Sequence, residues 1–125
     1  MEKIYIEASE DKPSVRIEPD KSLLRIYGAS YPENSTKFYH DIIQWLKDNG
    51  TKMKDEFVCD FYFNYINSAS KKSVYELMLV LENLKKSGIK IYVKWNYDIY
   101  DDDMLEMGRE FLEMTDLPYM LIPRE

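Results

Sequence analysis

The sequence predicts a single α/β domain in which three α-helices pack on a mixed β-sheet of about five to six strands. Three observations predict this class. Three short strand-like segments separated by turn residues open the chain, helical and strand patterns alternate after residue 34, and no repeat or linker divides the 125 residues. We therefore expect one domain over residues 1–125.

The first thirty residues carry the strand signals "KIYIEA" (3–8), "SVRIE" (14–18) and "LLRIYGA" (23–29). The intervening "SEDKP" and "PDKS" are rich in Pro, Asp and Ser, which favour turns. Short turns between consecutive strands predict an antiparallel meander.

The period then changes to that of a helix over residues 35–49, with Asn34, Ser35 or Thr36 able to cap its start. Gly50 suits a left-handed helix end. The next segment, "DEFVCDFYFNYI" (55–66), carries apolar side chains at both parities, which predicts a central strand with two buried faces. Cys59 lies within it and is interpreted as a small buried hydrophobe.

A second helix is expected to begin near Ser70 and to end before Gly88. Residues 89–97 predict a strand, "DDDMLEMGREFLEM" a third helix, and residues 119–122 a last short strand. This order requires at least one parallel crossover, and a right-handed βαβ unit over residues 55–97 is strongly preferred.

The composition narrows the class of function. A formal charge of −6 with lysines scattered along the chain argues against nucleic-acid binding. One cysteine, no signal-peptide pattern and no apolar run of membrane-spanning length indicate a cytoplasmic protein that is neither secreted nor inserted in a membrane.

The stretch "NYINSASKKS" (64–73) lies at a strand-to-helix turn, where free backbone amides favour an oxyanion. A phosphoryl group on Ser68 would be stabilised there by roughly 0.3–1 kcal/mol, with help from Lys71 or Lys72. A plain helix cap formed by Asn67, Ser68 and Ser70 explains the same residues. Spacing by itself does not decide between the two interpretations.

Other chemistry has weaker support. Asp101, Asp102 and Asp103 are adjacent and splay apart on a helix start, so dipole compensation is preferred over metal binding. The only histidine, His40, and the only thiol, Cys59, lie in different elements. Neither a nucleophile elbow nor a glycine-rich phosphate loop is present, so we expect no enzyme, no cofactor and no metal.

Three stretches together resemble the SiaC family of bacterial regulatory phosphoproteins: "GASYPENSTKFYHDIIQWL", "YFNYINSASKKSVYELMLVLENLKKSGIKIYVKWNYD" and "DDDMLEMGREFLEMTDLPYMLI". The resemblance implies a fold similar to the anti-sigma-factor antagonist (STAS) domain and a role as the switch protein of a partner-switching circuit. It also implies a kinase with a histidine-kinase-like ATP fold, a PP2C-type phosphatase, and a GGDEF diguanylate cyclase that the unphosphorylated form binds.

The resemblance places the turn asparagine at Asn67 and the phosphate acceptor at Ser68, with Ser70 as the competing site. The family's acceptor is commonly threonine, and Ala69 replaces what is often a serine. The leading hypothesis is a non-enzymatic switch controlled by phosphorylation of Ser68. The alternatives are a constitutive binding or scaffold module in which Ser68 only caps a helix and, third, an enzyme that uses the aspartate cluster with a metal.

Overall fold

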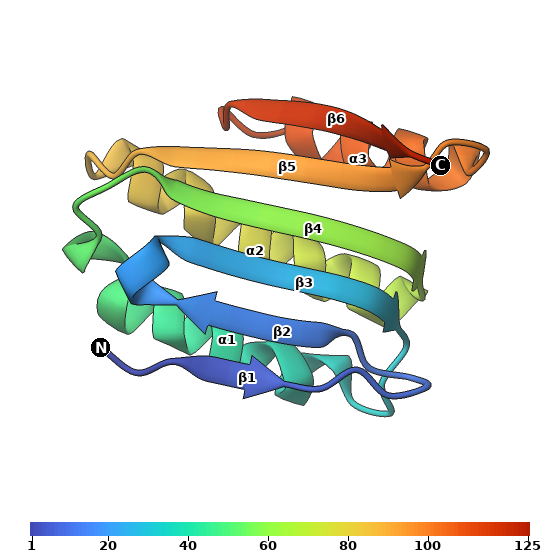
Figure 1. Ribbon diagram of the computed structural model, residues 1–125, viewed down its shortest axis with the longest axis horizontal. Coiled ribbons are helices and arrows are strands. Elements are labelled where there is room, and N and C mark those ends of the chain that lie inside the picture. The colour runs from blue at the N-terminus through green and yellow to red at the C-terminus, as the bar shows by residue number, and fades with distance from the viewer.

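The computed structural model describes residues 1–125 and begins with three strands, β1 (Ile4–Ile6), β2 (Ser14–Glu18) and β3 (Leu23–Ser30). Helices and strands then alternate: α1 (Ser35–Asn49), β4 (Phe57–Ile66), α2 (Ser68–Lys86), β5 (Ile91–Asp98), α3 (Asp102–Glu113) and β6 (Tyr119–Arg124). Short 3-10 turns occupy Pro19–Lys21 and Gly50–Lys52. The predicted class, with three helices and a mixed sheet, is confirmed (Figure 1).

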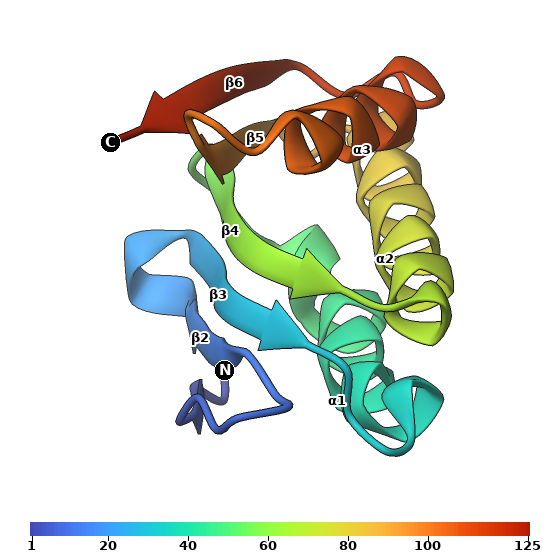
Figure 2. The ribbon, with the colours of Figure 1, turned by 90° about the vertical axis from the view of Figure 1, so that its right-hand side faces the viewer.

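The six strands lie in the sheet in the order of the chain, from β1 at one edge to β6 at the other. β1, β2 and β3 pair antiparallel, as the meander predicted, while β3 to β6 pair parallel. Each parallel crossover advances in the same direction across the sheet, so crossovers of the preferred hand place their helices on the same side. Figures 1 and 2 show α1, α2 and α3 together on one face, which leaves the other face uncovered.

The core lies between the covered face and the three helices and contains 26 buried apolar residues. Cys59 is among them, as predicted, and burial raises the pKa of its thiol. Trp95 also lies there and donates a hydrogen bond to the Met104 carbonyl at 3.1 Å. α3 approaches this ring so closely that a Cβ on Gly108 would stand 2.2 Å from Trp95 Nε1, so only glycine fits.

The strand β4 is central, between β3 and β5, but the prediction that both its faces are buried under apolar neighbours is wrong. Phe57, Cys59, Phe61 and Phe63 face the core, whereas Asp60, Tyr62 and Asn64 belong to the uncovered face. The alternation was obscured because Val58 and Tyr62 are apolar or aromatic at positions that no helix covers.

Two helix boundaries differ from expectation. Gly50 keeps right-handed backbone angles (φ −57°, ψ −36°) instead of the left-handed ones, and a Cβ there would lie 2.6 Å from Leu84 Cδ1. Close packing therefore explains this glycine. α2 begins at Ser68, two residues before the predicted start, because the Asn67 side chain caps it. None of the helices combines the length and apolarity that a bilayer crossing requires.

The edge strand β6 contains Pro123. The Val93 and Ile99 amides donate to the Pro118 and Arg124 carbonyls, so even-numbered residues of β6 direct their backbone groups toward β5. Pro123 has the opposite parity and stands where an amide would face outward, which is where a strand tolerates proline.

Candidate functional site

The start of α2 follows directly from the carboxyl end of β4, and Asn67 forms its cap. The Asn67 Oδ1 accepts a hydrogen bond from the Ser70 amide at 2.8 Å, and the Asn67 carbonyl accepts one from the Lys71 amide at 2.8 Å. The amides of Ser68 and Ala69, the first two helical residues, are left without a partner in the helix. The helix start therefore keeps donors for an anion.

Ser68 is the first residue of α2 and is exposed to solvent. Its hydroxyl takes no part in the cap, since Asn67 supplies the accepting oxygen, and it has no hydrogen-bond partner within the chain. The interpretation in which Ser68 itself caps α2 is wrong. A group added to Ser68 Oγ would stand in solvent beside the two free amides.

Ser70, the competing acceptor, is completely buried. The Ser30 hydroxyl donates to Ser70 Oγ at 2.9 Å and lies 2.7 Å from the Tyr39 hydroxyl, so the three side chains form a polar cluster joining β3, α1 and α2. Burial raises the pKa of Tyr39 to about 12, with the Ser30 hydrogen bond acting in the opposite direction. Modification of Ser70 would require this cluster to open.

The predicted supporting lysines lie in the first turns of α2, where no acidic residue is present. Lys71 Nζ is 3.2 Å from Glu110 Oε2 on α3, and both side chains are about half exposed. Lys72 is exposed and forms no ion pair. With Ser68 they line a shallow pocket of about 310 Å³ between α2 and α3, whose other lining residues are Tyr75, Glu110, Phe111 and Met114.

The aspartate cluster belongs to the start of α3. The Asp101 carboxylate caps this helix by accepting the Met104 amide at 3.0 Å, and Asp102 and Asp103 occupy its first turn. This agrees with the dipole interpretation. No group of three or more His, Cys, Asp or Glu side chains is arranged to hold a metal ion. His40 is exposed on α1 while Cys59 is completely buried, so they cannot form a catalytic pair.

Sequence reasoning missed Glu110, Ser30 and Tyr39. Glu110 lies 39 residues from Lys71, and nothing in the spacing relates them. Ser30 and Tyr39 resemble ordinary turn and helix residues in the sequence, and only their joint burial with Ser70 gives them a role.

An α/β domain with one exposed serine hydroxyl at a capped, acid-free helix start belongs to the class of small proteins that can carry a regulatory phosphate. Comparison with known families agrees. The sequence model of the SiaC family regulatory phosphoproteins matches residues 6–124, so the chain belongs to the SiaC family.

Relatives cover the whole chain at low identity. An uncharacterized protein of Pseudomonas aeruginosa strain UCBPP-PA14 is 24% identical over 121 residues, covering 97% of this chain and 96% of its own length. The crystal structure of apo-SiaC from Pseudomonas aeruginosa is 24% identical, with a TM-score of 0.89 over 98% of this chain and 99% of its own.

A second structure shows the diguanylate cyclase SiaD of Pseudomonas aeruginosa in complex with its activator SiaC. It matches at 23% identity and a TM-score of 0.90, over 97% of this chain and 99% of the matched chain. At this identity the solved structures establish the shared fold.

Proposed function

We propose that this chain is the non-enzymatic switch protein of a partner-switching circuit in the cytoplasm. A kinase with a histidine-kinase-like ATP fold phosphorylates Ser68, and a PP2C-type phosphatase removes the phosphate. The unphosphorylated form binds an effector such as a GGDEF diguanylate cyclase. Membership of a family of regulatory phosphoproteins supports the phosphate, and the SiaD–SiaC complex supports a cyclase as effector.

One observation carries the choice of Ser68. Its hydroxyl is exposed and unbonded at a helix start whose cap is already complete, whereas Ser70 is sealed in a hydrogen-bonded cluster. A constitutive scaffold that needs Ser68 as a cap is accordingly not favoured, because Asn67 performs that function.

The effect of the phosphate would be local. A phosphoserine brings about −1.5 to −2 charges, which the amides of Ser68 and Ala69 and the nearby lysines can stabilise. Lys71 would be shared between the phosphate and Glu110, whose carboxylate the new charge repels. The charge of the pocket beside α2 would become strongly negative. An effector that docks against this pocket would be disfavoured without any refolding of the domain.

The test is mass spectrometry after incubation with ATP and a kinase of this type encoded near the chain. We expect one phosphate on Ser68, none on a Ser68→Ala variant, and unchanged modification of Ser35→Ala, a matched serine at the start of α1. Phosphate on Ser70, or none at all, would contradict the proposal.

Effector binding provides the second readout. Ser68→Ala should bind a diguanylate cyclase in the presence of kinase and ATP, whereas the unmutated chain should lose binding and regain it on addition of the phosphatase. Binding that ignores the kinase and phosphatase would favour a constitutive binding module.

A further inference from the structure

The uncovered face of the sheet has a composition unlike that of the covered face. Its side chains come from alternate positions of all six strands and include four tyrosines and four basic residues: Tyr5, Tyr27, Tyr62, Tyr92, Arg16, Arg25, Lys94 and Arg124. Tyrosine and arginine are the residues that protein interfaces favour. No helix lies on this face (Figure 2).

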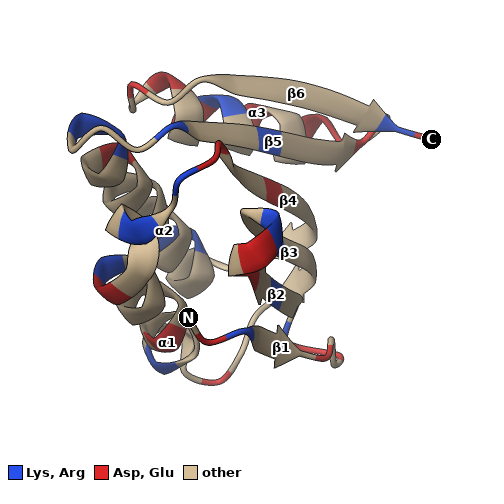
Figure 3. Ribbon diagram, turned by 60° about the vertical axis from the view of Figure 1, so that its left-hand side comes forward, with Lys and Arg blue, Asp and Glu red and all other residues tan.

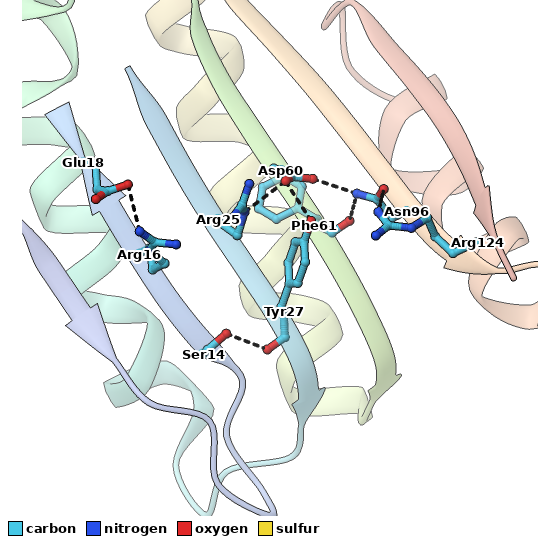
Figure 4. Close-up of polar contacts among 9 residues, drawn as sticks. All are labelled: Ser14, Arg16, Glu18, Arg25, Tyr27, Asp60, Phe61, Asn96 and Arg124. Carbon is cyan, nitrogen blue, oxygen red and sulfur yellow. Dashed lines mark hydrogen bonds and ion pairs between the residues drawn. The ribbon is translucent and has the colours of Figure 1, made fainter. Parts of the chain in front are cut away.

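A polar network joins the middle of this face across four strands (Figure 4). Asp60 Oδ2 accepts hydrogen bonds from Arg25 Nε at 3.1 Å and from the Tyr27 hydroxyl at 2.9 Å. Asp60 Oδ1 accepts one from Asn96 Nδ2 at 2.7 Å, and Arg124 donates to Asn96 Oδ1 at 2.8 Å. Because the central positions are polar and mutually satisfied, an apolar layer laid over them would gain little burial.

Acidic and basic groups occupy different depths on this face. The side chains of Asp60 and Glu18 are 9% and 5% exposed, whereas those of their ion-pair partners Arg25 and Arg16 are 35% and 39% exposed. The carboxylates lie underneath and the guanidinium groups face the solvent. Lys94 forms no ion pair, and Arg124 is bonded to a neutral amide while it lies over the Tyr62 ring.

The strand residues of this face comprise four bases and three acids (Glu18, Asp60 and Asp98), a formal charge of +1. The rest of the chain, whose total is −6, then carries −7. Figure 3 shows basic residues on β5 and at the end of β6, with an acidic one on β4 between them and the meander. An anionic partner is therefore repelled by the rest of the surface and directed to this face.

We propose that the uncovered sheet face is a docking surface for a carboxylate-rich segment of a partner protein. Carboxylates match the outward guanidinium groups in geometry and charge. A short acidic segment fits within the face, whereas a long polyanion such as a nucleic acid would extend over the −7 remainder of the molecule. Six strands at about 4.8 Å spacing and roughly 20 Å length offer on the order of 500–600 Å², most of the ~800 Å² per partner of a standard interface.

This surface is separate from the phosphorylation site. Ser68 begins a helix that packs on the opposite face, so a phosphate there changes none of the charged side chains that the partner would contact. The inference goes beyond the proposed switch and does not depend on it, because binding here is expected in either phosphorylation state.

The test uses the isotope-labelled full chain titrated with a peptide of about ten glutamates, a model acidic segment, and followed by NMR at low ionic strength. We expect amide shifts to concentrate on β3 to β6 and to include Lys94. Lys94→Glu should weaken the apparent affinity several-fold, since Lys94 belongs to no ion pair and its loss leaves the Asp60 network intact. Lys37→Glu, the same charge change at an exposed site on α1, should leave the affinity unchanged.

Shifts spread over the helices, equal effects of the two lysine variants, or no shifts at all would overturn the proposal. Tighter binding of a single-stranded oligonucleotide than of the peptide would overturn it as well, by reassigning the face to nucleic acid. None of these measurements involves a kinase, so failure here leaves the Ser68 proposal untouched and failure of that proposal leaves this one untouched.

Discussion

The starts of α1 and α2 share the same pair of residues, an asparagine followed by a serine, yet only one serine is available for chemistry. Asn34 and Asn67 both cap their helices by accepting an amide three residues later, at 3.0 Å and 2.8 Å. Ser35 is 5% exposed and lies 3.5 Å from Ser73 of α2, whereas Ser68 is exposed. The local motif sets the backbone and the cap, and tertiary packing decides which hydroxyl a kinase can reach.

The largest expected contrast comes from placing a carboxylate at each serine. Ser35→Asp should lower the free energy of unfolding by about 3 kcal/mol, because it buries a charge between two helices. Ser68→Asp should raise it by about 0.3–1 kcal/mol through the helix dipole. Urea-induced unfolding of both variants measures the difference. Similar effects at the two positions would break the comparison.

A smaller effect concerns the polar cluster that seals Ser70. Because burial holds the Tyr39 pKa at about 12, above the ordinary value near 10, the unfolded state ionises this tyrosine first as the pH rises. Tyr39 therefore contributes stability that is complete below about pH 10 and is lost toward pH 12, by at most about 2.7 kcal/mol.

The measurement for Tyr39 is unfolding free energy against pH, with Tyr39→Phe as the control. The variant should be less stable at neutral pH by about 1 kcal/mol, since the contact with Ser30 is lost. It should also show a shallower decline above pH 10. The same slope in both proteins would mean that Tyr39 is not buried as described.

The smallest effect sharpens the comparison by testing what the two helix starts share. Asn34→Ala and Asn67→Ala should each lower the free energy of unfolding by about 1 kcal/mol, because each removes one cap of similar geometry. Asn→Asp at the same positions keeps the accepting oxygen and should restore most of the loss. A much larger effect of Asn67→Ala would indicate that its cap also maintains the Ser70 cluster.

Much of the fold could be predicted because periodicity and turn residues are local signals. The order of elements, the antiparallel meander and the parallel unit around β4 all follow from them. The polarity of one β4 face was missed because Tyr62 and Val58 read as buried residues in the sequence. Whether a helix covers a given face depends on the direction of successive crossovers, which no single segment encodes.

The site was only partly accessible to sequence reasoning. Asn67, Ser68, Lys71 and Lys72 are neighbours along the chain, so a local pattern and a family resemblance could identify them. The burial of Ser70 depends on Ser30 and Tyr39, and the ion pair of Lys71 depends on α3. Likewise Arg16 and Arg124 share one surface only because the register of six strands brings them there, so lysines and arginines that look scattered in the sequence form a basic face.

Pro123 has a consequence for the behaviour of many molecules together. Edge strands with regular donors and acceptors invite the addition of another strand and, repeated, the growth of fibrils. The missing donor of Pro123 interrupts that row on the outer side of β6, and at the other edge β1 has only three residues. Strand-by-strand polymerisation is thereby discouraged at both ends, which suits a protein that must remain free to exchange partners at high concentration.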